Sequence, residues 1–234
     1  MTVDDKTHRL STKQLKSKIL EILDSKNFKK EISFLIEMYS AKMITPLFSA
    51  SYNSSKEIRW HAVSSFGYLA KYLAENDSSK ITEIIRRCIW MLTEESGGIP
   101  WNAPAIMGEI MANSREAAQV FSSILFSYVD EPEDEPENFL DNLQLRISSY
   151  WGIFRLSQIL PEFVIENEKI IMQRLEREDN PEALVLLCLT ATNIGLSERL
   201  TKMKTLSSDA RRVELYINEE FKVLSLREVS NFQI

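Results

Sequence analysis

The sequence predicts an all-α protein of helical pairs stacked side by side, with a small β-hairpin at its C-terminal end. Three observations support this fold class. Six glycines and seven prolines in 234 residues are too few for the turns of a β-rich fold. Apolar residues recur at intervals of three and four over most of the chain, as on one face of a helix. A pattern centred on glycine also repeats with a period near 43 residues.

Four glycines define this repeat. Gly67, Gly108, Gly152 and Gly195 are spaced by 41, 44 and 43 residues, each follows a large apolar residue, and each has a small residue three positions earlier. A glycine inside a helix costs about 1 kcal/mol relative to alanine. The shared register therefore predicts a flat helix face that a neighbouring helix approaches closely. Two helices per period of this length are typical of HEAT and armadillo repeats, which predicts a right-handed α–α superhelix.

The chain is predicted to form one domain over residues 1–234, beginning with a capping helix within residues 1–27. Ser11 or Thr12 is the expected N-cap of this helix, and a basic arm that touches an acidic partner is the alternative. Residues 28–206 are predicted to hold the helical repeats. In the first half we expect helices over 28–39, 46–52, 58–74, 81–94, 100–112 and 115–129.

The joint between two of these helices is the segment EESGGIPWNAPAIMGEI, residues 94–110. Gly97 and Gly98 supply the positive φ that commonly ends a helix. Pro100 follows, and proline is tolerated in a first helical turn because its missing N–H would have no partner there. The segment therefore predicts one helix that stops and a new helix that starts.

The second half begins with an acidic segment, residues 130–141, which holds seven acidic residues and two prolines. It is predicted to be an exposed loop, with a docking site for a basic partner or a loose cation site as alternatives. Helices are expected over 139–160, 163–178, 181–194 and 197–206. Residues 207–234 alternate apolar and polar side chains, which predicts a hairpin with a tight turn at 218–220 and a short helical turn after it. We expect this hairpin to dock on the last helices, because a two-stranded ribbon is marginal alone.

Three segments carry a resemblance to a known group of proteins. IRWHAVSSFG, GGIPWNAPAIMGEI and LRISSYWGIFRL are similar to HEAT-like repeat proteins found in anaerobic bacteria, such as sulfate reducers, and in some archaea. The resemblance covers the chain from about residue 28 to its end and implies the repeat fold. That group carries no established activity, so the resemblance implies nothing about chemistry.

Composition bounds the possible functions. The net charge of −6 disfavours nucleic-acid binding, which usually requires a basic surplus. The two histidines and two cysteines do not have zinc spacing, and no phosphate-binding loop or GxSxG motif occurs, so no cofactor and no metal are expected. Residues 1–10 lack the apolar core of a secretory signal, and the longest apolar run is too short to span a bilayer. The sequence predicts no membrane contact, a cytoplasmic location, and two buried reduced thiols.

The candidate binding residues lie at equivalent positions of successive repeats. The pairs Trp60–His61, Trp101–Asn102 and Leu145–Arg146 stand seven and six residues before a repeat glycine. Stacked repeats place such positions in a row, so they predict a ladder of indole rings and hydrogen-bonding groups for a peptide or another extended ligand. The alternative is that the tryptophans only fill space between helices. The full predicted set of binding residues is Trp60, His61, Trp101, Asn102, Glu109, Arg146 and Trp151.

Two functions remain open at this point. The first is a non-catalytic binding module or scaffold that presents a curved helical surface to a protein or peptide, in an oligomeric state that the sequence does not define. The second is a HEAT-like enzyme, such as an alkylpurine DNA glycosylase or a bilin lyase. A glycosylase needs a basic inner surface to hold the DNA backbone. The positions of Arg86, Arg87, Arg174 and Arg177 therefore discriminate between the two functions.

Overall fold

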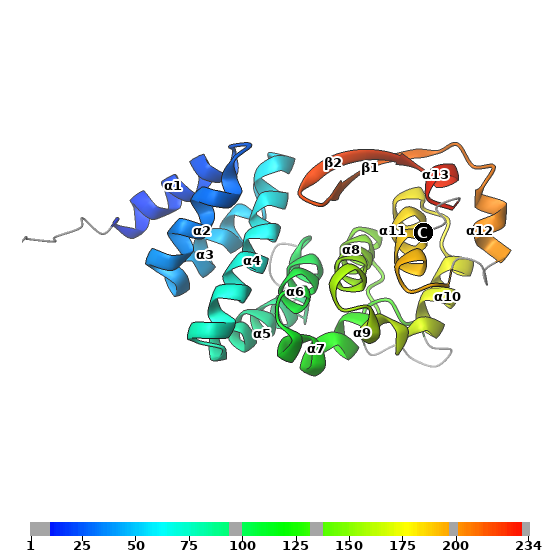
Figure 1. Cartoon of the computed structure of the whole chain (residues 1–234), viewed down its shortest axis with the longest axis horizontal. Coiled ribbons are helices and arrows are strands. Elements are labelled where there is room, and N and C mark those ends of the chain that lie inside the picture. Colours follow the sequence, from blue (N-terminus) through cyan, green and yellow to red (C-terminus); the bar gives the residue numbers. More distant parts are fainter. Residues whose placement is uncertain (1–9, 94–99, 132–137, 197–200, 231–234) are drawn as a thin grey trace, which may run out of the picture.

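The computed structural model describes residues 10–93, 100–131, 138–196 and 201–230, which form two rows of helices and a hairpin (Figure 1). The inner row lies next to the hairpin. The outer row lies on the side of the inner row that faces away from the hairpin (Figure 1). The inner row consists of α4 (Lys56–Asn76), α6 (Ala103–Ala112), α8 (Leu143–Ile159) and α11 (Pro181–Asn193). The outer row consists of α5 (Ser79–Thr93), α7 (Arg115–Ser127), α9 (Pro161–Ile165) and α10 (Glu168–Arg177). The predicted HEAT/armadillo-like solenoid is confirmed.

The two ends of the array are covered by shorter elements. At the N-terminal end, α1, α2, a short 3-10 helix and α3 pack against α4 (Figure 1). Their bounds are Thr12–Leu23, Phe28–Tyr39, Ser40–Met43 and Ile44–Ala50. Ser11 accepts a hydrogen bond from the amide of Gln14, as the N-cap of α1. At the C-terminal end lie α12 (Thr201–Leu206) and α13 (Leu226–Ser230).

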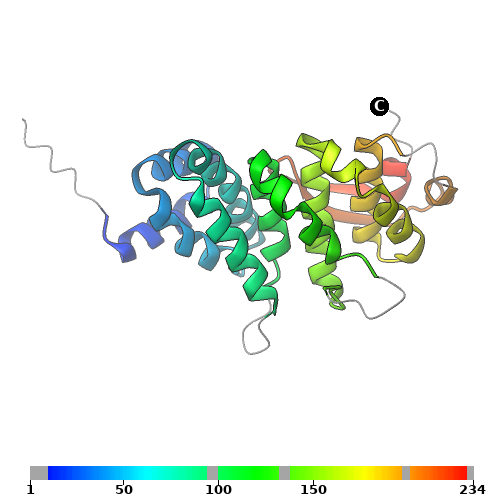
Figure 2. The same ribbon diagram turned by 90° about the horizontal axis from the view of Figure 1, so that it is seen from below.

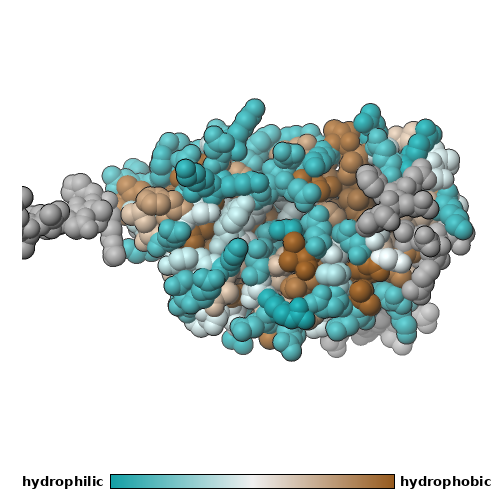
Figure 3. All heavy atoms as spheres, viewed as in Figure 1, coloured by the Kyte–Doolittle hydropathy of each residue, from teal (hydrophilic) through white to brown (hydrophobic). Residues whose placement is uncertain are grey.

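Burial explains the apolar composition of α6, at the centre of the inner row. All ten residues of α6, from Ala103 to Ala112, are buried, because α6 has neighbours in both rows. A helix that is apolar all round is stable only inside a core. The face of the molecule seen in Figure 3 is mostly hydrophilic and carries small hydrophobic patches. Among the described helices, none is both long enough and apolar enough to cross a membrane.

The repeat glycines explain how closely the inner helices approach. A Cβ atom added to Gly108 would lie 2.2 Å from the Cα atom of Gly152, so the backbones of α6 and α8 are in contact. At Gly67 the added atom would lie 2.3 Å from a carboxylate oxygen of Glu109, so this glycine makes room for a side chain of α6. The predicted flat face is therefore present at the centre of the row.

The prediction for Gly195 is wrong. This residue follows the end of α11 with φ +73, and an added Cβ would meet nothing within 4 Å. The amides of Gly195 and Leu196 donate to the carbonyls of Thr192 and Ala191, which is the Schellman arrangement that ends a helix. Gly195 shares the sequence register of the other three glycines, but it is kept for its backbone conformation and not for helix packing.

Two other predicted helices differ from the structure. The helix expected over 163–178 is two helices, α9 and α10, separated by a turn at Glu166 and Asn167. The helix expected over 139–160 begins only after Asn142, whose side chain accepts hydrogen bonds from the amides of Gln144 and Leu145. The glycine pair Gly97–Gly98 and parts of the acidic segment and of the 197–206 helix lie outside the described residues.

The predicted hairpin is present, but it packs against earlier helices of the chain than expected, including α8 and α4. Strands β1 (Arg212–Ile217) and β2 (Glu220–Ser225) pair antiparallel around Asn218 and Glu219, whose φ values of 52 and 64 are typical of a tight hairpin turn. The indole Nε1 of Trp151 in α8 donates to the Tyr216 carbonyl over 2.7 Å. Glu219 reaches Tyr68 in α4. The hairpin therefore crosses the inner row rather than covering only its last helices, and Figure 2 shows it behind α8 and α11.

Candidate functional site: a groove across the first turns of the inner helices

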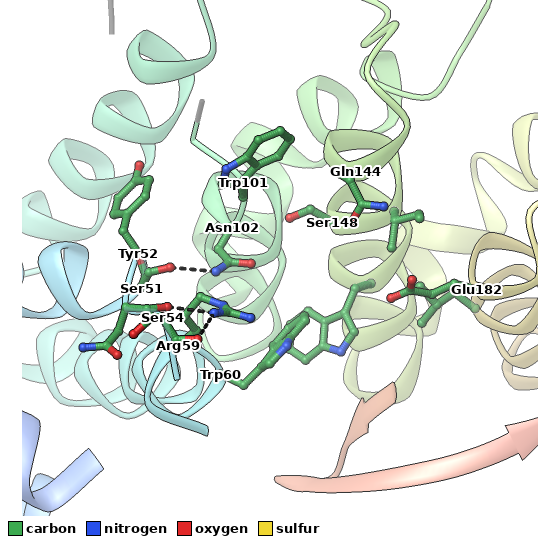
Figure 4. Close-up of a pocket in the computed structure, with 14 residues that line it drawn as sticks. Ser51, Tyr52, Ser54, Arg59, Trp60, Trp101, Asn102, Gln144, Ser148 and Glu182 are labelled. Atoms are coloured by element: carbon green, nitrogen blue, oxygen red, sulfur yellow. Dashed lines mark hydrogen bonds between the residues drawn. The ribbon is translucent and has the colours of Figure 1, made fainter. Parts of the chain in front are cut away.

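A groove of about 540 Å³ crosses the first turns of α4, α8 and α11 and the two residues just before α6. Three helices of the inner row and the residues that lead into the fourth therefore contribute to it, as equivalent ends of stacked repeats should. Figure 4 shows its walls: Tyr52 and Arg59 lie on one side, Gln144 and Glu182 on the other, and Trp101 lies above. The lining residues are Ser51, Tyr52, Asn53, Ser54, Arg59, Trp60, Trp101, Asn102, Gln144, Ile147, Ser148, Trp151, Glu182 and Leu186.

Two tryptophans from different repeats meet in this groove. The ring centroids of Trp60 and Trp151 lie 4.8 Å apart at an interplanar angle of 49°. Trp60 also stacks on Tyr216 of the hairpin, with centroids 5.3 Å apart and an angle of 19°. Because Trp151 donates its indole N–H to the Tyr216 carbonyl, the hairpin fixes both rings. The aromatic surface is thus arranged before any ligand arrives.

The wall contributed by α6 is also held in place. Asn102 donates a hydrogen bond of 2.8 Å from its side-chain amide to the Ser51 carbonyl, which joins α6 to the end of α3. The hydroxyl of Ser148 in α8 accepts a 3.1 Å hydrogen bond from the amide of Ala105. Trp101, by contrast, remains 41% exposed, so its ring is available to a ligand.

Only Arg59 and Glu182 carry a charge among the described residues that line the groove. Arg59 donates from one guanidinium nitrogen to the carbonyls of Asn53 and Ser54, at 2.7 and 2.8 Å. The carboxylate of Glu182 has no ion pair and no side-chain hydrogen bond within the described part of the chain. Burial raises its pKa above the ordinary value. The groove is therefore close to neutral overall and has opposite charges on its two sides.

The structure brings four of the seven predicted binding residues together in the groove: Trp60, Trp101, Asn102 and Trp151. His61 lies outside it. Its Nδ1 atom donates to the Leu23 carbonyl over 2.7 Å, and its ring stacks on Phe28 with centroids 3.9 Å apart. Burial lowers the pKa of His61, so the imidazole is neutral at pH 7 and connects α4 to α1 and α2.

Glu109 and Arg146 also lie outside the groove. Glu109 is buried between α6 and α8, where Arg155 donates to it over 2.7 Å. Burial raises the pKa of Glu109, and the charge of Arg155 opposes that shift. Glu109 borders a smaller cavity of about 320 Å³ beneath the hairpin turn. Arg146 donates to the Leu140 and Asp141 carbonyls at 2.9 and 2.7 Å and supports the loop before α8.

The arginines that discriminate between a binding module and a DNA enzyme lie in the outer row. Arg86 and Arg87 are on α5, and Arg87 lies over the Phe48 ring at 4.3 Å. Arg174 and Arg177 are on α10, and both pair with Glu131. None of the four lines the groove, so they do not supply the basic inner surface that a DNA backbone requires. Within the described residues, no group of three or more His, Cys, Asp or Glu side chains is arranged to hold a metal ion.

Sequence reasoning missed Glu182, Arg59, Gln144 and Ser148 as groove residues. The pattern Pro-Glu at residues 181 and 182 is repeated at 161 and 162, where the structure gives an ordinary surface ion pair between Glu162 and Arg115. The neighbouring sequence does not distinguish Glu182 from Glu162, because both follow a proline that starts a helix. The available signal was positional, since Gln144 stands one residue before the Leu145 position that aligns with Trp60 and Trp101.

No protein-family model and no curated protein sequence matches the chain. Solved structures share its fold. A designed armadillo repeat protein has a TM-score of 0.50 at 15% identity over 95% of this chain and 93% of that chain. Another, in complex with the peptide (KR)4, has a TM-score of 0.52 at 15% identity over 87% and 90%. An engineered protein has a TM-score of 0.51 at 9% identity over 95% and 90%. This chain thus has an armadillo-like helical repeat fold.

Proposed function

We propose that this protein is a non-catalytic binding module whose groove holds an extended segment of a protein partner. The observation that carries the proposal is the convergence of Trp60, Trp101 and Trp151, from three successive repeats, on one groove. Tryptophan is enriched among the residues that dominate binding energy at protein interfaces. The hydrogen bonds of Trp151 and Asn102 fix the groove in advance, which lowers the entropy lost on binding.

A peptide is favoured over a globular surface because of the groove's dimensions and chemistry. The groove is lined by residues of α4, α8 and α11 and by the two residues before α6, and its walls offer amide and hydroxyl groups at Asn102, Gln144 and Ser148. An extended chain carries regularly spaced N–H and C=O groups that such side chains can bind. The designed armadillo repeat protein in complex with the peptide (KR)4 shows that this fold can bind a peptide.

The test is selection of random dodecapeptides on the immobilised protein, followed by affinity measurement on two matched variants. Trp101→Ala removes an exposed indole of the groove, and Trp90→Ala removes one that is 60% exposed on α5, outside the groove. We expect selected peptides to bind the Trp90→Ala variant like the wild type and to bind the Trp101→Ala variant roughly tenfold or more weakly. Selection that enriches nothing, or peptides that lose the same affinity on both variants, would overturn the proposal.

A further inference from the structure

The structure points to one chemical feature of the ligand, and this inference rests on the proposed function. We infer that the partner segment carries an arginine or lysine whose side chain lies beside Glu182 and against the indoles of the groove, at the α11 side. The neutral and polar remainder of the segment lies along the amide and hydroxyl groups of α6 and α8.

Glu182 carries a carboxylate that no described residue pairs with, in a partly enclosed part of the groove. Glu182 is half-buried in the groove, and no described residue forms an ion pair or a side-chain hydrogen bond with its carboxylate. An uncompensated carboxylate that loses water is unfavourable, and an opposite charge from a ligand offsets that penalty.

The start of α11 does not account for this carboxylate. Acidic residues often stand in a first helical turn because they bind or face its free amides. Here the side chain of Asn180 already accepts hydrogen bonds from the amides of Glu182 and Ala183, at 2.9 and 3.1 Å. The carboxylate of Glu182 is consequently left free to face the groove, as Figure 4 shows.

The same groove also presents an aromatic surface. Indole rings attract cations through their electron-rich faces, and the attraction strengthens when water is excluded. Trp60 is half-buried and held by Tyr216, and the exposed ring of Trp101 stands above the groove. A guanidinium or ammonium group on a long apolar stem satisfies both features, because its stem packs on the indoles while its charge meets the carboxylate.

The position of Arg59 determines on which side of the groove the ligand's basic side chain lies. Arg59 lies across the groove from Glu182, with Trp60 between them (Figure 4). A second base on that side would face a like charge. The groove therefore selects a cationic side chain at the α11 side and disfavours one at the α4 side, so the order of charges along the partner is part of the recognition.

The experiment uses the full chain and the tightest peptide from the selection described above. Each basic residue of the peptide is replaced in turn by citrulline (for arginine) or norleucine (for lysine), which keep size and remove charge. The protein variants are Glu182→Gln and its matched control Glu162→Gln, since both glutamates follow a proline that starts a helix. Binding is measured by titration calorimetry at low and moderate salt.

We expect one basic residue whose neutral substitute weakens binding to the wild type about tenfold. The same substitution should have no effect on binding to the Glu182→Gln variant, because the coupling partner is gone. The Glu162→Gln variant should behave like the wild type. Selected peptides without a required base, or equal effects of the two protein variants, would overturn this inference while leaving the proposed groove intact. Selection that yields no groove-binding peptide would overturn both.

Discussion

Two glutamates that stand four residues apart, on either side of the turn between α10 and α11, have opposite environments. Glu178 is buried and accepts hydrogen bonds from Arg174 and Tyr150, at 2.6 and 2.7 Å, and a further one from Arg146. Although burial acts in the other direction, these partners lower its pKa. Glu182 has no such partner within the described residues, and burial raises its pKa. Glu178, which holds helices together, thus has its charge paired. Glu182, which faces the groove, has no described partner.

The largest effect is expected where the satisfied cluster is broken. Arg174→Met removes a guanidinium that contacts Glu178, Tyr150 and Glu131. Because breaking a buried ion pair leaves an uncompensated charge, we expect the free energy of unfolding to fall by about 3 kcal/mol. Urea denaturation measures this, and peptide affinity at native conditions should remain that of the wild type. A loss below about 1 kcal/mol, within the usual worth of a surface pair, would remove the contrast between the two glutamates.

The next effect tests whether the groove depends on the spacing of the inner helices. Gly108→Ala forces apart the backbones of α6 and α8, and we expect it to lower the free energy of unfolding by about 2 kcal/mol. It should also weaken peptide binding, because Trp101 lies just before α6 and Ser148 lies in α8, so the substitution separates two groove residues. The control is Gly195→Asn, which keeps a left-handed backbone position and has open space for the side chain. Equal losses in the two variants would contradict close helix contact as the cause.

A smaller effect on stability is expected at Glu182 itself. Glu182→Gln removes a charge that has no described partner, so the free energy of unfolding should stay within about 0.5 kcal/mol of the wild type or rise slightly. Chemical denaturation of wild type and variant side by side measures this difference. A marked loss of stability would mean that Glu182 is structural and that its contrast with Glu178 is false.

The smallest effect is the pH dependence of stability, and it has opposite signs at the two residues. The pKa of Glu182 is raised in the folded state, so its contribution to the free energy of unfolding is greatest below the ordinary value of 4.5 and declines as pH rises through the raised pKa. The pKa of Glu178 is lowered, so its contribution is present above 4.5 and is lost as pH falls through the lowered pKa. Unfolding is measured from about pH 2 to pH 7, which covers the range below 4.5 for Glu178 and above 4.5 for Glu182. The difference between wild type and Glu182→Gln and the difference between wild type and Glu178→Gln should change with pH in opposite directions. Slopes of the same sign would contradict the assignment.

The sequence predicted the repeat because close packing leaves a mark in the residue pattern. Gly108 and Gly152 touch, and only glycine permits that contact. The same pattern misled at Gly195, because a helix-ending glycine and a packing glycine are identical letters in the same register. The place where the hairpin docks could not be predicted from local sequence either, since Trp151 and Tyr216 are 65 residues apart and only the tertiary fold brings them together.

The candidate site was predictable in its aromatic part and not in its charges. Trp60 and Trp101 recur at one register, and stacked repeats bring one register to one side. His61 and Arg146 follow the same register by one residue, which turns them about 100° around a helix and away from the groove. Asn102 has the same position in its repeat but precedes α6, and it lines the groove. Glu182 was indistinguishable from Glu162, because its role depends on what the fold leaves unpaired around it.

The most direct test of the groove uses the four tryptophans of the chain as reporters. Trp60, Trp101 and Trp151 line the groove, whereas Trp90 is exposed on α5 outside it. The indole N–H resonances are followed in a proton–nitrogen correlation spectrum while a selected peptide is added, with Trp→Phe variants for assignment. The account predicts that the resonances of Trp60, Trp101 and Trp151 shift together in a saturable way and that the Trp90 resonance stays in place. A shift confined to Trp90, or saturable binding that moves none of the three groove resonances, would contradict it.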